Sequence, residues 1–118
     1  MDPTHLYEVT VPDYLPAEEG RLDRSAGFTV TRRTMAVQMR IECEYARQTE
    51  GLALVTDFLS RFAGAMADLK VLVVKSPPGW DPEQLDATDP ANVELLFRVW
   101  EAIREQEITF RRKLAKAG

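Results

Sequence analysis

The strongest constraint on the fold is a run of apolar residues at helical spacing between Leu52 and Val73. Its members lie three or four residues apart, and they are Leu52, Val55, Leu59, Phe62, Met66, Leu69 and Val73. This spacing places their side chains on one face of an α-helix. A second run, between Pro90 and Leu114, contains Val93, Leu96, Phe97, Trp100, Ile103 and Phe110. The sequence therefore predicts two amphipathic helices whose apolar faces must pack against each other or against another surface.

Length and composition predict one small globular domain over residues 1–118. Hydrophobic residues make up 45% of the chain and charged residues 29%, which is typical of a folded protein. A core of this size is modest, so a homo-oligomer would add stability. The net charge of −4 argues against a general nucleic-acid binder. No apolar run approaches the roughly 20 residues that span a bilayer, so we do not expect a membrane as a partner. The charge argument likewise leads us to expect no nucleic-acid partner.

Two segments of alternating apolar and polar residues predict an N-terminal antiparallel β-hairpin over residues 5–11 and 27–33. The residues expected to face inward are Tyr7, Val9, Val11, Phe28 and Val30. Residues 13–26 between the strands contain Pro, Gly and several charges, and we expect a long mobile loop there. A connection of this length leaves the strand register open.

Three main helices are expected after the hairpin, over residues 35–49, 52–74 and 90–115. Thr34 has the residue type of an N-cap for the first of them. Apolar residues of the first helix form two rows, one of Val37, Ile41 and Tyr45 and the other of Met39, Cys43 and Ala46. This helix is therefore expected to contact two surfaces. A short strand over residues 70–75 is the alternative for the end of the second helix, because valine favours strands.

Proline residues mark the remaining boundaries. Pro77-Pro78-Gly79 ends the second helix. Asp81 before Pro82 has the pattern of an N-cap followed by a first-turn proline, which predicts a short helical turn over residues 82–86. Asp89 and Pro90 repeat this pattern at the start of the last helix, and residues 112–118 are expected to fray. The predicted fold class is α+β, mainly α.

No pattern in the chain indicates catalysis or a cofactor. His5 is the single histidine and has no partner nearby in sequence. Cys43 is expected to be a small buried apolar residue. Three glutamates of the last helix alternate with arginines and are expected on a solvated face; they are Glu101, Glu105 and Glu107. Glu94 with Arg98, and Glu107 with Arg111, have the spacing of helical ion pairs. We therefore predict a protein that is not an enzyme.

The acidic residues around Pro82 do not predict a metal site either. They are Asp81, Glu83, Asp86 and Asp89. Their spacing lacks the central glycine of a calcium loop. Two of them, Asp81 and Asp89, are better explained as helix caps.

Four apolar residues are the candidates for partner binding. Val71, Leu72 and Val74 lie off the main apolar face of the second helix. Trp80 follows Pro-Pro-Gly, where a tryptophan either covers the core or anchors a partner. We predict these four residues as part of a partner-binding surface.

The order of these parts resembles the small tail assembly chaperones of tailed bacteriophages and prophages. The resemblance covers residues 27–112. The residues that carry it are Phe28-Thr29-Val30-Thr31-Arg32-Arg33-Thr34-Met35, Lys70-Val71-Leu72-Val73-Val74, Pro77-Pro78-Gly79-Trp80-Asp81, Leu85-Asp86-Ala87-Thr88-Asp89 and Arg104-Glu105-Gln106-Glu107-Ile108-Thr109-Phe110-Arg111. The segments around Trp80 and Glu105 are the most specific of these.

This resemblance implies a role in assembly without catalytic residues. Such chaperones bind the long apolar tape measure protein and help the tail-tube protein to polymerise around it, in the cytoplasm of the bacterial host. Some form rings or helical multimers, and many have a longer frameshifted form. Two alternatives stay open: a structural virion protein, such as a tail-completion or head–tail connector protein, and a small helical regulatory or interaction module.

Overall fold

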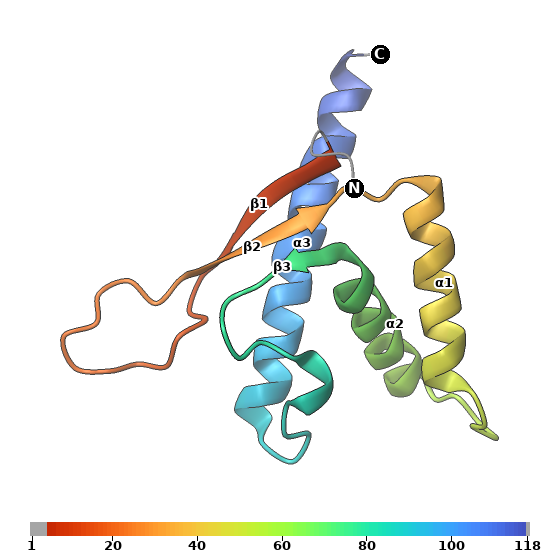
Figure 1. Ribbon diagram of the computed structural model, residues 1–118, viewed down its shortest axis with the longest axis horizontal. Helices are drawn as coiled ribbons and strands as arrows, with labels where there is room; N and C mark the ends of the chain where they lie inside the picture. Colours follow the sequence, from red (N-terminus) through yellow and green to blue (C-terminus); the bar gives the residue numbers. More distant parts are fainter. Residues whose placement is uncertain (1–4, 118) are drawn as a thin grey trace.

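The computed structural model describes residues 5–117, which form a small α+β fold that is mostly helical (Figure 1). Its elements are β1 (Leu6–Val11), β2 (Ala26–Thr31), α1 (Met35–Thr49), α2 (Asp57–Leu72), β3 (Val73–Lys75), the 3-10 helix η2 (Pro82–Gln84) and α3 (Pro90–Ala117). The predicted fold class is confirmed, as is the antiparallel pairing of β1 with β2.

The first two strands have the predicted inward and outward faces. Val9 lies opposite Phe28 in the register, and both side chains are buried. Val11 and Val30 are also fully buried, whereas Tyr7 is half-buried. This alternation follows from the two-residue period of a strand, which sends every second side chain into the core.

The end of the second predicted helix is wrong, because Val73–Lys75 forms a third strand. This strand pairs antiparallel with β2, with Val73 opposite Val30, and makes β2 the central strand of the order β1-β2-β3. An isolated hairpin would leave the backbone groups along one edge of β2 unpaired. The end of α2 lies beside that edge, so the β-branched residues after Leu72 complete the sheet instead of another helical turn.

The start of the second predicted helix is also wrong. α2 begins at Asp57, after the N-cap Thr56, whose hydroxyl accepts a hydrogen bond from the Leu59 backbone N–H at 3.1 Å. Residues 50–56 are a connection that leaves α1 through Gly51, which has a left-handed φ of 81°. Thr before Asp is a capping signal that outweighs apolar spacing. Leu52 and Val55 therefore lie outside the helix.

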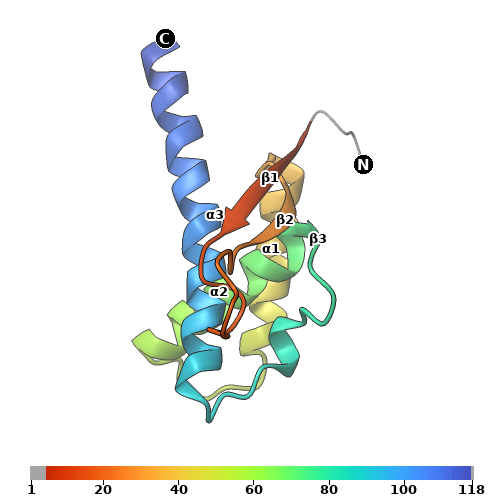
Figure 2. The same cartoon turned by 90° about the vertical axis from the view of Figure 1, so that its left-hand side faces the viewer.

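Other predicted boundaries agree with the structure. The Thr34 hydroxyl caps α1 by accepting a hydrogen bond from the Val37 N–H at 3.1 Å. Asp81 and Asp89 cap η2 and α3 by accepting from the N–H groups two residues further on. η2 is shorter than predicted. α3 runs through the segment expected to fray, and its last turns project beyond the rest of the fold (Figures 1 and 2).

The core lies where the sheet, α2 and α3 meet, with α1 packed along α2 (Figure 1). Its largest fully buried side chains include Phe28, Leu69, Leu72, Leu96 and Ile103. The connection between β1 and β2 projects away from this core and is held by hydrogen bonds between Leu15 and Arg24. Although α3 has 28 residues, no helix within residues 5–117 combines the length and apolar character needed to cross a bilayer.

Candidate interaction surfaces

The four predicted partner-binding residues do not form one surface. Leu72 is fully buried in the core, so its prediction as a contact residue is wrong. It is the last residue of α2, and its side chain packs inside the fold because the chain turns there into β3. Trp80 packs edge-to-face on Phe28, with ring centres 5.4 Å apart, and so covers the core. Val71 is half-buried, and only Val74 is clearly exposed.

Exposed apolar side chains gather instead at the connection between α1 and α2. We call this the connection patch, and its members are Leu52, Leu54, Val55, Phe58 and Leu59. Leu54 is 75% exposed and Phe58 is 61% exposed. Monomeric proteins seldom expose neighbouring large apolar side chains without a function. The helical spacing from Leu52 onward identifies most of these residues as one apolar face, but it predicts that they lie on a continuous helix and are buried.

A second set of exposed apolar residues lies along the outer face of α1. This outer row contains Met35, Met39, Cys43 and Ala46. Met35 is 87% exposed, and the inner row of Val37 and Ile41 is buried on the opposite side. The prediction of a buried Cys43 is therefore wrong. Helix α1 has two apolar faces, as expected, but within residues 5–117 only one of them is covered.

A groove of about 340 Å³ lies between α1 and α2, and its lining includes Ser60, the residue after Leu59 of the connection patch. Ile41 and Tyr45 line it from α1, Gly64 and Ala65 line it from α2, and Trp100 closes one side. The hydroxyl groups of Tyr45 and Ser60 share a hydrogen bond of 3.1 Å across it. A Cβ atom added to Gly64 would meet no atom within 4 Å, so this part of the groove is open.

Aromatic rings connect the connection patch to α3. Phe58 stacks on Phe62 with ring centres 6.1 Å apart, Phe62 contacts Phe97 at 6.4 Å, and Phe97 contacts Trp100 at 6.3 Å. Such contacts are favourable beyond the area that they bury. The Phe58 ring is therefore held in place by a row of rings that reaches the core, and a partner that covered it would contact an ordered side chain.

A buried polar network ties these helices together. Trp100 Nε1 donates to Asp68 Oδ2 at 2.9 Å, and Arg33 donates to Asp68 Oδ1 at 3.2 Å. Arg33 also donates from Nε and Nη2 to both carboxylate oxygens of Glu107, at 2.9 and 3.1 Å. Burial lowers the pKa of the Arg33 guanidinium, but the hydrogen bonds and charges of Glu107 and Asp68 outweigh burial and raise it. Arg33 therefore stays charged inside the fold.

Glu107 was expected on a solvated face and paired with Arg111, and both expectations are wrong. Its side chain is only 15% exposed and bonds Arg33, which is 74 residues away in sequence. The expected pair of Glu94 with Arg98 does not occur within residues 5–117 either, because Arg98 donates to the backbone oxygen of Asp13 at 3.1 Å. No local spacing signal could have found the Arg33 partner.

A second charged cluster joins α1, α2 and η2. Lys70 Nζ lies 2.9 Å from Glu44 Oε1 and 2.7 Å from Glu83 Oε1, and Arg47 binds Glu44 from the next turn of α1. Hydrogen bonds from Arg47, and then from Lys70, lower the pKa of Glu44 to about 2. These ion pairs join η2 to α1 and α2.

The acidic segment around η2 uses its oxygens in the same structural way. Asp86 Oδ1 accepts from the backbone N–H and hydroxyl of Thr88, at 2.9 and 2.6 Å, and Asp89 accepts from Ala91 and Asn92. Within the part of the chain that the structure describes, no three His, Cys, Asp or Glu residues are grouped so that they could hold a metal ion. His5 is exposed at the start of that part.

Comparison of the chain with protein-family models, with curated proteins and with solved structures finds no match in any of the three. Evidence for a function therefore comes from the geometry of the exposed apolar surfaces and from the sequence resemblance.

Proposed function

We propose that this chain is a non-enzymatic tail assembly chaperone of a tailed bacteriophage. In this proposal it binds the tape measure protein and helps the tail-tube protein to assemble around it, in the cytoplasm of the bacterial host. The observation that carries the proposal is the connection patch, in which five large apolar side chains are exposed at one end of the α1–α2 hairpin. The resemblance of residues 27–112 to such chaperones supplies the identity of the client.

The chemistry of the patch suits a long apolar client. An amphipathic helix of the client can place its apolar face along Leu54 and Phe58 and into the adjoining groove, which is how many helices are recognised. Met35 and Met39 of the outer row form a separate exposed surface towards the other end of α1, with flexible side chains that adapt to different apolar surfaces. The row of rings behind Phe58 gives this soft surface a fixed support.

The size of the patch favours binding by several copies of the chain together. Burying a large apolar side chain completely contributes about 1.5–3 kcal/mol, so each half-exposed member of the patch can still contribute about 1 kcal/mol. Five members then supply about 5 kcal/mol before the cost of association, which for one copy gives weak binding. Several copies joined as a homo-oligomer along one client would bind it more tightly through avidity.

Co-expression tests the proposal. The tape measure protein encoded in the same tail gene cluster is expressed alone, with the wild-type chain, and with the variant Leu54→Ser/Phe58→Ser. We expect the tape measure protein to be soluble with the wild-type chain but insoluble alone or with this variant. Because both side chains are exposed, the variant should fold normally, and Leu22→Ser is the matched control, since Leu22 is an exposed leucine in the β1–β2 connection.

Two results would contradict the proposal. One is a tape measure protein that stays insoluble with the wild-type chain, and the other is one that is rescued equally well by the patch variant. Recovery of the chain in stoichiometric amounts from purified particles would favour a structural virion protein instead.

A further inference from the structure

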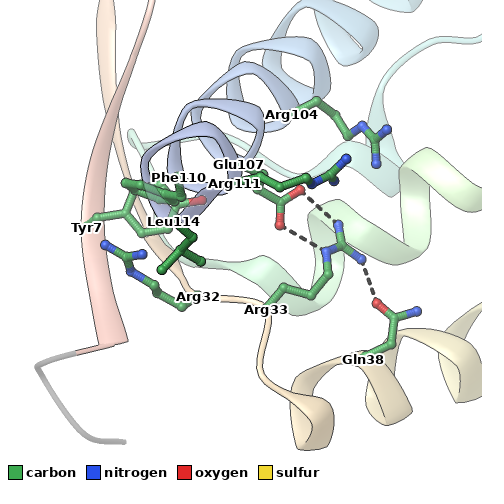
Figure 3. A pocket seen from close by; sticks show the side chains of 9 residues that line it. All are labelled: Tyr7, Arg32, Arg33, Gln38, Arg104, Glu107, Phe110, Arg111 and Leu114. Carbon is green, nitrogen blue, oxygen red and sulfur yellow. Dashed lines mark hydrogen bonds and ion pairs between the residues drawn. The ribbon is translucent and has the colours of Figure 1, made fainter. Parts of the chain in front are cut away.

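A basic cleft lies at the other end of the molecule, away from the α1–α2 connection. It has a volume of about 540 Å³ and lies between the C-terminal half of α3, β1 and the segment that leads from β2 into α1 (Figure 3). Arg32, Arg33, Arg104 and Arg111 line it, against one lining carboxylate, Glu107. This local excess of positive charge is opposite in sign to the net charge of the chain, which is −4.

One of the four arginines is already neutralised. Arg33 binds both oxygens of Glu107 (Figure 3). It also reaches Asp68, so it forms part of the buried network. Its Nη1 donates to Gln38 Oε1 at 2.8 Å as well. These bonds occupy the donors of Arg33 and the oxygens of Glu107. The pair therefore forms a fixed wall of the cleft rather than a binding group.

The other three guanidinium groups form no ion pair with any carboxylate among residues 5–117. Arg32 stacks on Phe110, with its guanidinium carbon 3.7 Å from the ring centre. Arg104 lies over Trp100 at 5.4 Å. Stacking occupies the flat face of a guanidinium and leaves its N–H edge free to donate. Arg32 and Arg104 are thus oriented by aromatic rings, with their donors available to an anion.

Carboxylates of a protein fit this cleft better than the phosphates of a nucleic acid. Single-stranded nucleic acids bind by stacking bases on exposed aromatic faces. Here Arg32 already covers one face of Phe110, and Trp100, under Arg104, does not line the cleft, so little ring surface is available to bases. The acidic balance of the whole chain also opposes a polyphosphate, with one charge per nucleotide, more than a peptide with two carboxylates. A carboxylate matches the fork of one arginine, as a phosphate does, so the two arginines on α3 suffice for a peptide with two acidic residues.

The spacing of the arginines defines the ligand further. Arg104 and Arg111 are two turns apart on α3, which is about 10 Å along the helix axis. A peptide in the polyproline II conformation has three residues per turn and rises about 3.1 Å per residue, so side chains three residues apart lie on one face, about 9 Å from each other. Leu114, exposed at the end of the cleft, offers contact to an apolar side chain. We propose that this cleft binds a short acidic segment of a partner protein, with two carboxylates three residues apart and an apolar residue beside them.

This inference does not depend on the chaperone proposal and is tested separately. The probe is a fluorescein-labelled peptide, Gly-Leu-Glu-Ser-Leu-Glu-Ser-Gly, titrated by fluorescence anisotropy with up to 1 mM protein at low salt. We expect binding that Arg104→Gln/Arg111→Gln weakens at least tenfold. The matched control is Arg112→Gln/Lys113→Gln, which removes the same charge from exposed neighbours that do not line the cleft and should change affinity less than twofold.

Circular dichroism checks that both double variants remain folded. Absence of binding at 1 mM, equal losses in the two variants, or equal binding of the peptide with glutamine in place of glutamate would each overturn the inference. A single-stranded DNA of ten nucleotides that binds more tightly than the peptide, with the same sensitivity to Arg104→Gln/Arg111→Gln, would replace it with a nucleic-acid site.

Discussion

Asp68 offers the sharpest test of how this fold is held together. Its side chain is buried, with 8% of the residue exposed, and it accepts hydrogen bonds from both Trp100 Nε1 and Arg33. It therefore joins α2 to α3 and to the segment before α1. Replacing it with alanine removes both bonds, and replacing it with asparagine keeps one oxygen acceptor but removes the charge.

The expected cost follows from the two bonds. A hydrogen bond to a charged group contributes about 1.5–3 kcal/mol, and a buried donor left without a partner costs about 1–3 kcal/mol. In the variant, Arg33 still binds Glu107, and its side chain is 25% exposed. The bond between Arg33 and Asp68 therefore contributes a free energy at the low end of this range. We expect Asp68→Ala to lower the free energy of unfolding by about 3 kcal/mol, and Asp68→Asn by about half as much.

Urea unfolding measures both values. Circular dichroism at 222 nm reports the helices, and tryptophan fluorescence reports the surroundings of Trp80 and Trp100 together. Glu18→Gln is the control, because Glu18 pairs with Arg21 on the exposed β1–β2 connection. A surface pair of this kind contributes at most about 1 kcal/mol, so this variant should unfold close to the wild type.

The opposite result is physically possible, which makes the test informative. Burying a charge is costly, and replacing a buried ion pair can leave stability unchanged. If Asp68→Ala and Asp68→Asn both unfold within about 0.5 kcal/mol of the wild type, the cost of burying the carboxylate cancels its bonds, and the stabilising role assigned to the network is refuted.

Three further predictions concern single side chains. Gly64→Ala should raise the free energy of unfolding by about 1 kcal/mol, because alanine favours helix and its Cβ meets no atom within 4 Å; an unchanged or lower urea midpoint would contradict the open groove at this position. Burial, followed by the charge of Glu107, raises the pKa of the Tyr7 phenol to about 12. The folded state therefore keeps the phenol proton at a pH where the unfolded state, with a pKa of about 10, has lost it. The free energy of unfolding should fall as the pH rises from about 10 to 12. Melting temperatures at pH 9, 10 and 11 should fall less for Tyr7→Phe, and equal falls would argue against this cause. Cys43 should react with iodoacetamide in the native protein as fast as in urea, as measured by mass spectrometry, whereas protection without urea would show that the outer row is covered.

Local signals predicted much of this fold correctly. Alternation identified the two strands of the hairpin, and Thr34, Asp81 and Asp89 marked helix starts that the structure confirms. These signals work because a strand face or a helix cap involves residues within a few positions of one another. Thr56 is also a cap, but the apolar spacing from Leu52 predicts a helix that begins before it.

The sequence predicts that some apolar helix surface is exposed, but it does not predict which residues form that surface. The sequence contains more apolar helix surface than the core covers, and the structure exposes it at the connection patch and outer row rather than at Leu72. Which apolar face becomes covered depends on how helices and sheet pack, and that arrangement is set by contacts between distant residues. Spacing alone could not distinguish the inner from the outer row of α1.

The sequence by itself determined the hairpin, the helical content, the caps and the surplus of apolar residues, because each of these depends on neighbours in the chain. Tertiary structure alone decided that Val73 joins β2 and that Glu107 binds Arg33 rather than Arg111. An exposed pair four residues apart contributes only a few tenths of a kcal/mol, whereas a partly buried two-bond contact to arginine is stronger. The distant partner prevails because folding brings it close and removes water from around both charges.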